Sequence, residues 1–424
     1  MKKSFLGLVV LVLSLVGAQL FSACDNKEAP SVNDINKQTI LVFMPWSGTA
    51  ASSGLYPVFR QNLDSIEGAI LKAKRLQGRL MVFISTAARQ SELYEVGYTG
   101  GKIVHTPIKT YAGNDYTTAA GITQILNDVK ANAPALNYAM MVGCHGCGWT
   151  YKADWENYPF QAKRNVLVPG QKQEAAAGAK GMGGGAAWPT TRFFGSVGDK
   201  AYGIDVPTLA DGIRGAGLKM QYILFDDCYM ANVETAYELR QATNYLIAST
   251  SEVLALGVPY QTMWSALASA TPNYKTAVSA FHTFYSTYAY PYGALSAIDC
   301  RKVDGLAAMM RQINQRYVLA DSLVDSLQVL DGFNTPLFYD LGDYADHLCP
   351  NTTLLSDFHS RLDEVVKAKA ATDTLYSYLY AAPLIYKGEK LLGAHRLRPQ
   401  PPSGGPERQG ENRVVESHAL RQGA

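Results

Sequence analysis

Short apolar runs alternate with helical segments over the first 250 residues, and this alternation limits the folds that the chain can adopt. The apolar runs are 39–46, 79–86, 137–144, 221–228 and 244–250. The helical segments are 55–75, 116–132, 205–217 and 230–242. Nearly continuous apolar runs are typical of parallel strands buried on both faces. The pattern therefore predicts an α/β fold, with a mostly parallel sheet between two layers of helices.

The rest of the chain has a different pattern. Residues 260–385 are largely helical in pattern, so they either close the same sandwich or form a helical subdomain. Residues 150–200 are a long insertion between two predicted core elements, and loops of this length are usually functional or disordered. From about residue 393 the apolar periodicity ends, and we expect a disordered tail over 393–424.

The N-terminus has the pattern of an export signal. Lys2 and Lys3 precede an apolar run that is short for a membrane-spanning helix, and Ser-Ala-Cys follows at 22–24. This tripeptide resembles a bacterial lipobox. We therefore expect residues 1–23 to be removed, Cys24 to be lipidated, and residues 24–37 to tether the protein to a membrane of the cell envelope. An ordinary secretory signal with a chance cysteine is the alternative.

Charge and cysteine content narrow the function. The formal net charge is +2 over 424 residues, so no strong field favours nucleic acid, and we expect no nucleic-acid partner. Besides Cys24, the cysteines are Cys144, Cys147, Cys228, Cys300 and Cys349. An odd number in an exported protein leaves at least one thiol unpaired. This is a reason to look for a working thiolate.

Two predicted strands end in residues that suit nucleophilic catalysis. His145 follows one strand and Cys228 lies at the end of another, and ligands of open parallel sheets bind outside the carboxyl ends of strands. Cys228 also precedes the helix predicted at 230–242, whose N-terminus favours a thiolate and can hold an oxyanion. A thiolate needs an activating partner, and His145 is the candidate. A buried structural thiol and a turn histidine are the alternative.

The sequence Cys-His-Gly-Cys at 144–147 has two further interpretations. A structural zinc site needs four ligands, normally from a second pair, and the chain has no second C-x-x-C and no H-x-x-H. A thioredoxin-type pair would begin a helix, whereas Gly146 and Gly148 favour a loop. A zinc or redox protein is therefore the weaker interpretation, and Cys144 and Cys147 are expected to fill space beside the histidine.

Two motifs together resemble the clostripain family of cysteine peptidases, which belongs to the caspase-like clan. The first is His-Gly-x-Gly-Trp at 145–149, and the second is Asp-x-Cys-x-Met at 226–230, followed by Glu234. The early ILVFMPWSG and the late FYDLGDYADHLC (338–349) are also similar to bacteroidete members. The resemblance spans about 38 to 390.

The resemblance implies a caspase-like α/β/α sandwich over residues 38–392, with a helical C-terminal region, and a catalytic dyad. Cys228 would be the nucleophile that forms a thioester, and His145 would assist it and protonate the leaving amine. The backbone N–H groups of Gly146 and Cys228 would form the oxyanion hole. No metal or other cofactor is required, although some relatives need calcium; we see no calcium-loop signature.

The resemblance also implies a preference for Arg or Lys before the scissile bond. Asp226 matches the acidic residue that helps to bind this cation, and Glu252 is the only acid in 249–260, where relatives carry a second one. Asp227 replaces a residue that is usually small in the family, and we expect it to stabilise a turn or to cap the N-terminus of a helix. Relatives often cleave themselves between the two motifs, where the insertion offers Lys163-Arg164, Lys172 and Lys180.

We therefore expect an exported, lipid-anchored cysteine endopeptidase, made as a zymogen, that acts on proteins or peptides from the periplasm or the cell surface. The alternative from another class is a catalytically inactive surface lipoprotein that uses the same fold to bind protein or glycan.

Overall fold

The computed structural model describes residues 36–48, 54–150, 193–196, 199–331, 336–377, 382–385 and 392–395. Cys24, the lysines and the arginine of the insertion, and most of the predicted tail lie outside these residues. No helix in the described part of the chain is both long and apolar enough to cross a membrane.

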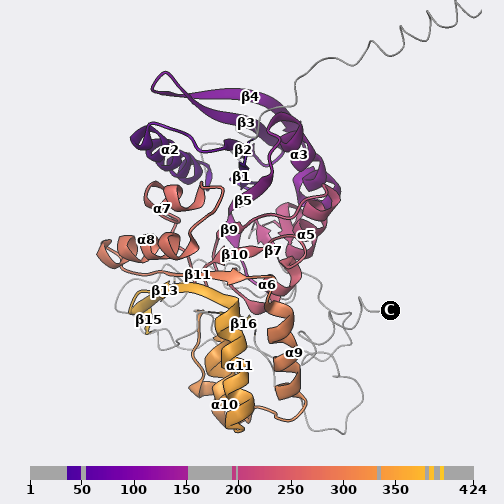
Figure 1. Ribbon diagram of the computed structural model, residues 1–424, viewed down its shortest axis with the longest axis vertical. Coiled ribbons are helices and arrows are strands. Elements are labelled where there is room, and N and C mark those ends of the chain that lie inside the picture. The colour runs from indigo at the N-terminus through magenta and orange to yellow at the C-terminus, as the bar shows by residue number, and fades with distance from the viewer. Residues whose placement is uncertain are drawn as a thin grey trace, which may run out of the picture. The chain divides into compact units, whose positions relative to one another are not determined.

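A nine-stranded sheet forms the centre of residues 37–395 (Figure 1). Its strands, in order across the sheet, are β13 (Val366–Ala371), β11 (Ala294–Asp299), β10 (Tyr245–Ala248), β9 (Ile223–Asp226), β5 (Asn137–Gly143), β1 (Gln38–Met44), β2 (Arg79–Ala87), β3 (Gln90–Thr99) and β4 (Lys102–Ala112). The strands from β10 to β2 are mutually parallel. At one edge β11 pairs antiparallel with both β10 and β13, and at the other edge β3 pairs antiparallel with both β2 and β4.

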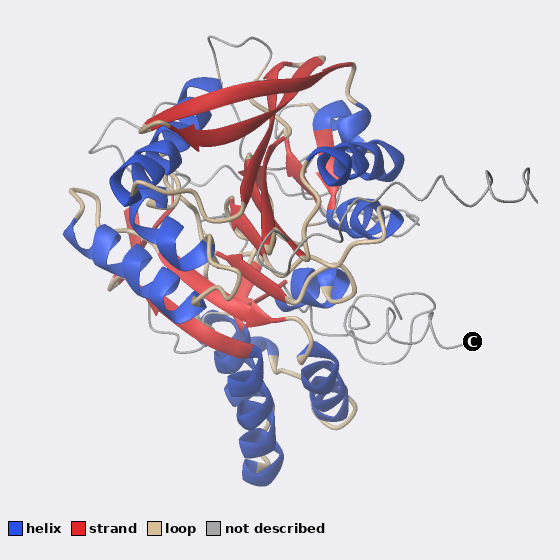
Figure 2. Cartoon of the chain, turned by 45° about the horizontal axis from the view of Figure 1, so that its top comes forward, coloured by secondary structure: helices blue, strands red, loops and turns tan. Residues whose placement is uncertain are grey.

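Helices cover both faces of this sheet, as Figures 1 and 2 show. One layer holds α2 (Tyr56–Ala73), α7 (Tyr260–Leu267) and α8 (Tyr274–Thr287), and α7 packs against the other two. The other layer holds α3 (Ala119–Asn132), α5 (Val206–Gly215), α6 (Val233–Leu239) and α9 (Val303–Asn314). Further along, α9 packs against α11 (Thr352–Val365), which packs against α10 (Leu341–Leu348). The predicted α/β sandwich with a mostly parallel centre is confirmed.

The buried parallel strands explain this arrangement. All residues of β1 are buried, and β9 is buried throughout. Strands that lose water on both faces need a helix layer on each side, because apolar surface is stabilised by leaving water. Each helix contributes one buried stripe, such as Ile122, Ile125, Leu126 and Val129 of α3.

Short elements lie around the main sheet. A three-stranded sheet joins β6 (His145–Gly146), β7 (Phe193–Gly195) and β8 (Gly203–Asp205). Two further pairs are β12 (Phe338–Asp340) with β16 (Gly393–His395) and β14 (Thr374–Ser377) with β15 (Ala382–Ile385). The 3-10 turns are η1 (Asp115–Thr117), η2 (Lys200–Tyr202) and η3 (Asp321–Ser326).

The region 260–385 differs from its helical expectation. It supplies β11 and β13, which extend the main sheet beyond β10, so it completes the sandwich rather than forming a separate helical subdomain. The sequence pattern also missed the hairpin of β3 and β4, because β4 is an edge strand that is mostly exposed. β16 includes the first residues of the segment that the sequence assigned to a tail.

Candidate active site

The register of the parallel strands brings the two motifs together. β5 and β9 are neighbours in the sheet, and Gly143 is paired with Asp226 at their carboxyl ends. His145 and Cys228 each lie two residues beyond this pair. The structure therefore places both at the same rim of the sheet, where open parallel sheets bind ligands.

Asp227 joins the two strand ends. Its side chain is 1% exposed and accepts a hydrogen bond from the Cys144 amide, at 2.6 Å from Oδ1. The Cys144 thiol donates to Oδ2 at 3.4 Å. The helix-capping work expected of Asp227 is wrong, since Asn232 is the residue at the N-cap of α6. Asp227 instead fixes the loop of His145 against the loop of Cys228.

Gly146 lies directly against the backbone of Cys228. A Cβ atom at Gly146 would stand 2.4 Å from the Cys228 carbonyl oxygen and 2.9 Å from the Cys228 amide nitrogen. Real Cβ atoms do not approach backbone atoms so closely, so only glycine permits this contact. The two amides predicted as oxyanion donors therefore belong to residues that are packed together.

The strand β7 pairs with the strand that contains His145. β7 pairs antiparallel with β6, and its Gly195 is opposite His145 while Phe194 is opposite Gly146. Phe194 is fully buried and packs edge-on against Phe225 of β9, with ring centroids 5.3 Å apart. The strand that positions His145 is thus held in place by the chain that follows the insertion.

The Cys228 sulfur is held by the loop after β10. The Val253 amide donates to Sγ at 3.3 Å, and the thiol faces the Val253 carbonyl at 3.7 Å. Burial raises the pKa of the Cys228 thiol, and the charge of Glu252 raises it further. The sequence expectation of a thiolate at a helix N-terminus is wrong, because α6 begins only at Val233.

His145 is in its neutral form near pH 7. Burial lowers the pKa of its imidazole, because the charged form loses hydration. A neutral imidazole at the same rim of the sheet as a neutral thiol is in the state that can accept the thiol proton. The pair therefore has the protonation states that a general base and its nucleophile need before the reaction.

Asp226 is buried beneath the same loop. It is 8% exposed, and it accepts hydrogen bonds from the Val258 amide at 2.8 Å and from Asn62 Nδ2 at 3.3 Å. Burial raises the pKa of Asp226 to about 7, against the opposing effect of the Val258 amide. Gly257 covers the carboxylate with φ +74°, and a Cβ there would stand 2.4 Å from Asp226 Oδ2.

Glu252 lies on the thiol side of this loop and is partly exposed. The Tyr229 hydroxyl donates to Glu252 Oε1 at 2.6 Å. Tyr229 follows the nucleophile, has φ +61° and stacks on Phe338 with ring centroids 5.4 Å apart. The sequence analysis named Glu252 but missed the part that Tyr229 plays, because nothing in the sequence reports a left-handed tyrosine.

Residues from the C-terminal region also border the site. Tyr229, Leu330, Leu337, Phe338 and Leu375 form a small buried apolar cluster, against which Cys228 packs. The Gly393 amide of β16 donates to the Ala231 carbonyl at 2.8 Å, in the loop that follows the nucleophile. The two sequence motifs gave no signal of these contacts, because the contributing residues are more than a hundred positions downstream.

The five described cysteines, Cys144, Cys147, Cys228, Cys300 and Cys349, are free. Cys144 is 8% and Cys147 1% exposed, and burial raises the pKa of both thiols. Within the described ranges, no group of three or more His, Cys, Asp or Glu side chains is placed to hold a metal ion.

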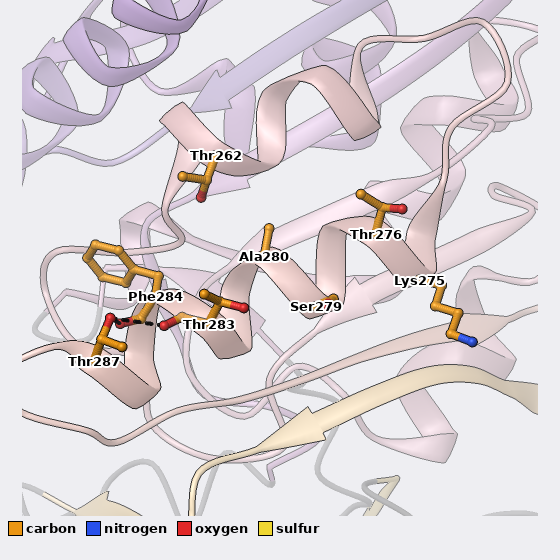
Figure 3. A pocket seen from close by; sticks show the side chains of 8 residues that line it. All are labelled: Thr262, Lys275, Thr276, Ser279, Ala280, Thr283, Phe284 and Thr287. Atoms are coloured by element: carbon orange, nitrogen blue, oxygen red, sulfur yellow. Dashed lines mark hydrogen bonds between the residues drawn. The ribbon is translucent and has the colours of Figure 1, made fainter.

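A surface pocket of about 560 Å³ lies elsewhere, along α8 and the start of α7 (Figure 3). It is lined by Thr262, Lys275, Thr276, Ser279, Ala280, Thr283, Phe284 and Thr287. None of the predicted site residues lines it, and it presents methyl and hydroxyl groups without a carboxylate.

Comparisons with known proteins identify the family of the chain. The model of the clostripain family matches residues 196–383, which include Cys228 but not His145. No curated protein matches the chain. A secreted C11 cysteine protease from Bacteroides thetaiotaomicron, "iotapain", is 37% identical over 85% of this chain and 93% of its own, with a TM-score of 0.73.

Two more distant structures show the fold alone. An inactive zymogen of a C11 protease from Parabacteroides distasonis is 23% identical over 84% of this chain and 91% of its own, with a TM-score of 0.66. A second secreted C11 cysteine protease from Bacteroides thetaiotaomicron, bound to an irreversible peptide inhibitor, is 17% identical over 91% of this chain and all of its own (100%), with a TM-score of 0.67.

Proposed function

Because this chain belongs to the clostripain family of cysteine proteases, which are hydrolases, we propose that it cuts peptide bonds with Cys228 as nucleophile and His145 as acid–base partner. The observation that carries the proposal is the register of β5 and β9, which aligns the two motifs at one rim. His145 takes the thiol proton while sulfur attacks the scissile carbonyl carbon. The imidazolium then protonates the leaving amine, and water hydrolyses the thioester.

The amides of Gly146 and Cys228 are the proposed oxyanion donors. The contact of Gly146 with the Cys228 backbone supports this, since donors on two packed loops need no reorganisation when charge develops. Asp227 supports the arrangement by joining the loops through Cys144.

We propose protein or peptide substrates with Lys or Arg before the cut. Glu252 is the acid that the substrate cation would meet, because it is partly exposed and its charge acts on Cys228. Asp226 would form the floor of the pocket, since it is buried. It also accepts a hydrogen bond from the Val258 amide, in the loop after β10. An aspartate with a pKa of about 7 becomes charged when a cation binds beside it.

Self-cleavage in the insertion is the proposed route of activation, at the basic residues Lys163-Arg164, Lys172 or Lys180. The pairing of β7 with β6 supports it, because the chain after the insertion holds His145. A cut upstream of β7 would release its strand from the insertion without breaking this pairing. Calcium is not assigned a role in these steps.

Export and anchoring are the proposed route to the substrate. The N-terminal signal predicts export, and the 37% identical Bacteroides relative is a secreted protease. Lipidation of Cys24 would then tether the enzyme to a membrane of the cell envelope.

A non-catalytic lipoprotein is the second candidate, and one observation favours it. The Cys228 thiol is hydrogen-bonded to Val253 and its pKa is raised, which is the state of an unreactive cysteine. A neutral thiol-alkylating probe separates the two functions, since an enzyme would be labelled at Cys228 in a way that depends on His145.

The decisive experiment compares the chain from residue 25 with its Cys228→Ala variant, in reductant, with and without calcium. Peptides with Lys, Arg or an uncharged residue before the cut report turnover and preference, and a gel reports self-processing. We expect turnover by the wild type alone. If neither protein cleaves any peptide and Cys228 is not labelled, the peptidase function is wrong for this chain.

A further inference from the structure

Three carboxylates surround the Cys228 thiol, and two of them are engaged in holding the fold. Asp226 accepts from Val258 and Asn62, and Asp227 accepts from Cys144. Both are at least nine-tenths buried. Glu252 differs, because it is partly exposed at the mouth of the site.

Glu252 is held in one position by a rigid neighbour of the nucleophile. The Tyr229 hydroxyl donates to its Oε1 at 2.6 Å. Tyr229 itself is 3% exposed, its ring stacks on Phe338, and its amide donates to the Ser251 carbonyl at 3.0 Å. Glu252 is thus held in two ways. Its chain neighbours Ser251 and Val253 are hydrogen-bonded to Tyr229 and Cys228, and its own side chain accepts from Tyr229.

The same loop holds the sulfur. Val253, which directly follows Glu252, donates its amide proton to Sγ at 3.3 Å. The residue that would bind the cation is therefore directly next to the residue that hydrogen-bonds the thiol. A movement or a change of charge at Glu252 can reach the thiol through this neighbour.

This inference rests on the proposed peptidase function. We propose that the hydrogen-bonded pair Tyr229–Glu252 couples binding of a cationic substrate side chain to activation of the Cys228 thiol. In the free enzyme the negative charge of Glu252 keeps the proton on sulfur. When the ammonium of a lysine or the guanidinium of an arginine pairs with Glu252, that charge is cancelled.

The proton then passes from sulfur to the neutral imidazole of His145, which leaves a thiolate and an imidazolium. Sulfur forms its bond to the carbonyl carbon, and the imidazolium proton goes to the amine as the C–N bond breaks. No oxidant, metal or further reactant is needed. Besides Glu252, the Asp226 and Asp227 carboxylates raise the pKa of this thiol, and the Val253 amide lowers it. The thiol in turn acts on Cys147 and Tyr285.

The direction of the electrostatic effects supports the coupling. The Cys228 pKa is raised by burial and next by Glu252, so removing the Glu252 charge should ease ionisation. A residue that only holds the loop together would have no such effect. The proposal therefore predicts that removing the Glu252 charge speeds alkylation of Cys228 and slows cleavage of a lysine peptide.

The test uses the mature chain, its Glu252→Gln and Tyr229→Phe variants, and Glu364→Gln as a matched control on the exposed face of α11. Alkylation of Cys228 by iodoacetamide is followed from pH 6 to pH 10, with the labelled site identified by mass spectrometry. Hydrolysis is measured on two peptides that differ only in lysine or the uncharged norleucine before the cut.

We expect Glu252→Gln to be alkylated about threefold to tenfold faster at pH 7.5, since one unit of pKa changes the thiolate fraction about tenfold. The same variant should cleave the lysine peptide at least about tenfold more slowly, and it should cleave the norleucine peptide faster, because its thiol ionises more easily. Tyr229→Phe keeps the ring stack and should raise KM for the lysine peptide alone. Glu364→Gln should match the wild type.

Alkylation that is unchanged or slower in Glu252→Gln would overturn the coupling, as would an equal loss on both peptides. If Glu252→Gln does not fold, Tyr229→Phe decides: equal KM values for the lysine peptide in this variant and the wild type reject the proposal. A wild type that cleaves norleucine and lysine peptides equally also rejects it, while the peptidase function stands. Activity that persists in Cys228→Ala would instead refute the proposed function.

Discussion

At the scale of single residues, Gly146 sets how closely the two catalytic loops approach. We expect Gly146→Ala to lower kcat by about a hundredfold or more, because the new Cβ would displace the Cys228 backbone. A proposed oxyanion donor would then be misplaced, and loss of one such donor costs about this much. Binding of substrate, read from KM, should change less. The measurement is steady-state turnover of a lysine peptide beside a circular dichroism spectrum.

Gly305→Ala is the matched control for this glycine. It lies inside α9, where the nearest atom to an added Cβ is 3.9 Å away. It should keep full activity and gain about 0.5–1 kcal/mol of stability, since glycine is a poor helix former. Normal turnover by Gly146→Ala would show that the close contact is not needed for catalysis.

Asp226 should lower the stability of the folded state as the pH rises. Its pKa is raised by burial from 3.8 to about 7, so its contribution to stability is complete below pH 4 and is lost as the pH rises through 7. Asp226→Asn removes this titration, at about 1.4 kcal/mol for each unit of pKa shift. The melting temperature of the variant relative to the wild type should therefore be higher at pH 7.5 than at pH 4.5.

Asp299→Asn is a control with the opposite sign. Burial opposes ionisation of Asp299, but the hydrogen bonds and charge of Arg301 outweigh it and lower its pKa. Its contribution is present above pH 4 and lost as the pH falls, so this variant should lose more stability at pH 7.5. Equal pH profiles for the wild type and Asp226→Asn would contradict the raised pKa.

At the scale of elements, β16 and Leu392 act as a clasp: they bind the loop that follows Cys228 and hold it to the C-terminal region. Gly393 donates to Ala231, the Leu341 amide donates to the Leu392 carbonyl at 2.9 Å, and Leu392 is fully buried. A chain that ends after residue 395 should keep the activity and melting temperature of the full chain. A chain that ends after residue 391 should lose about 2–5 kcal/mol, the usual cost of deleting a buried leucine side chain, together with most of its turnover.

A point variant tests the same clasp without truncation. Gly393→Val would bring a Cβ to 2.7 Å from Asn232 Oδ1, so it should lower activity in the full-length chain. Ala394 is 3% exposed in the same strand, and Ala394→Gly should cost less, because it adds no atom. Full activity of the chain that ends at 391 would exclude a role for β16.

Elements also differ in how well the sequence predicts them. β1, β5 and α3 were predicted to within a few residues, because continuous apolar runs and the helical spacing of apolar residues are local signals. β6 and β7 were not predicted, since their pairing depends on chain that returns after the insertion. The dyad followed from two motifs, whereas Tyr229 and Val253 needed the backbone geometry of their loops.

At the scale of the whole molecule, residues 37–395 share one main sheet and one main core. β11 lies between β10 and β13, so the C-terminal region completes the sheet that carries His145 and Cys228, the proposed dyad. The main apolar cluster likewise includes residues from both ends of this region, from Ile40 in β1 to Leu362 and Val365 in α11. We therefore expect residues 37–395 to unfold cooperatively.

Two probes, one in α7 and one directly after β11, test this cooperativity. Trp264 of α7 is 4% exposed, and its fluorescence is isolated as the difference between the wild type and a Trp264→Phe variant. Cys300 after β11 is 1% exposed and reports by reaction with a disulfide reagent. Their urea midpoints should coincide, because strand pairing of β10 with β11 joins the two parts. A Cys300→Ala variant identifies the thiol signal. If Cys300 reacts at a lower urea concentration than the one that changes Trp264 fluorescence, the C-terminal strands open first, and the clasp of β16 on the catalytic loop would be lost before the core.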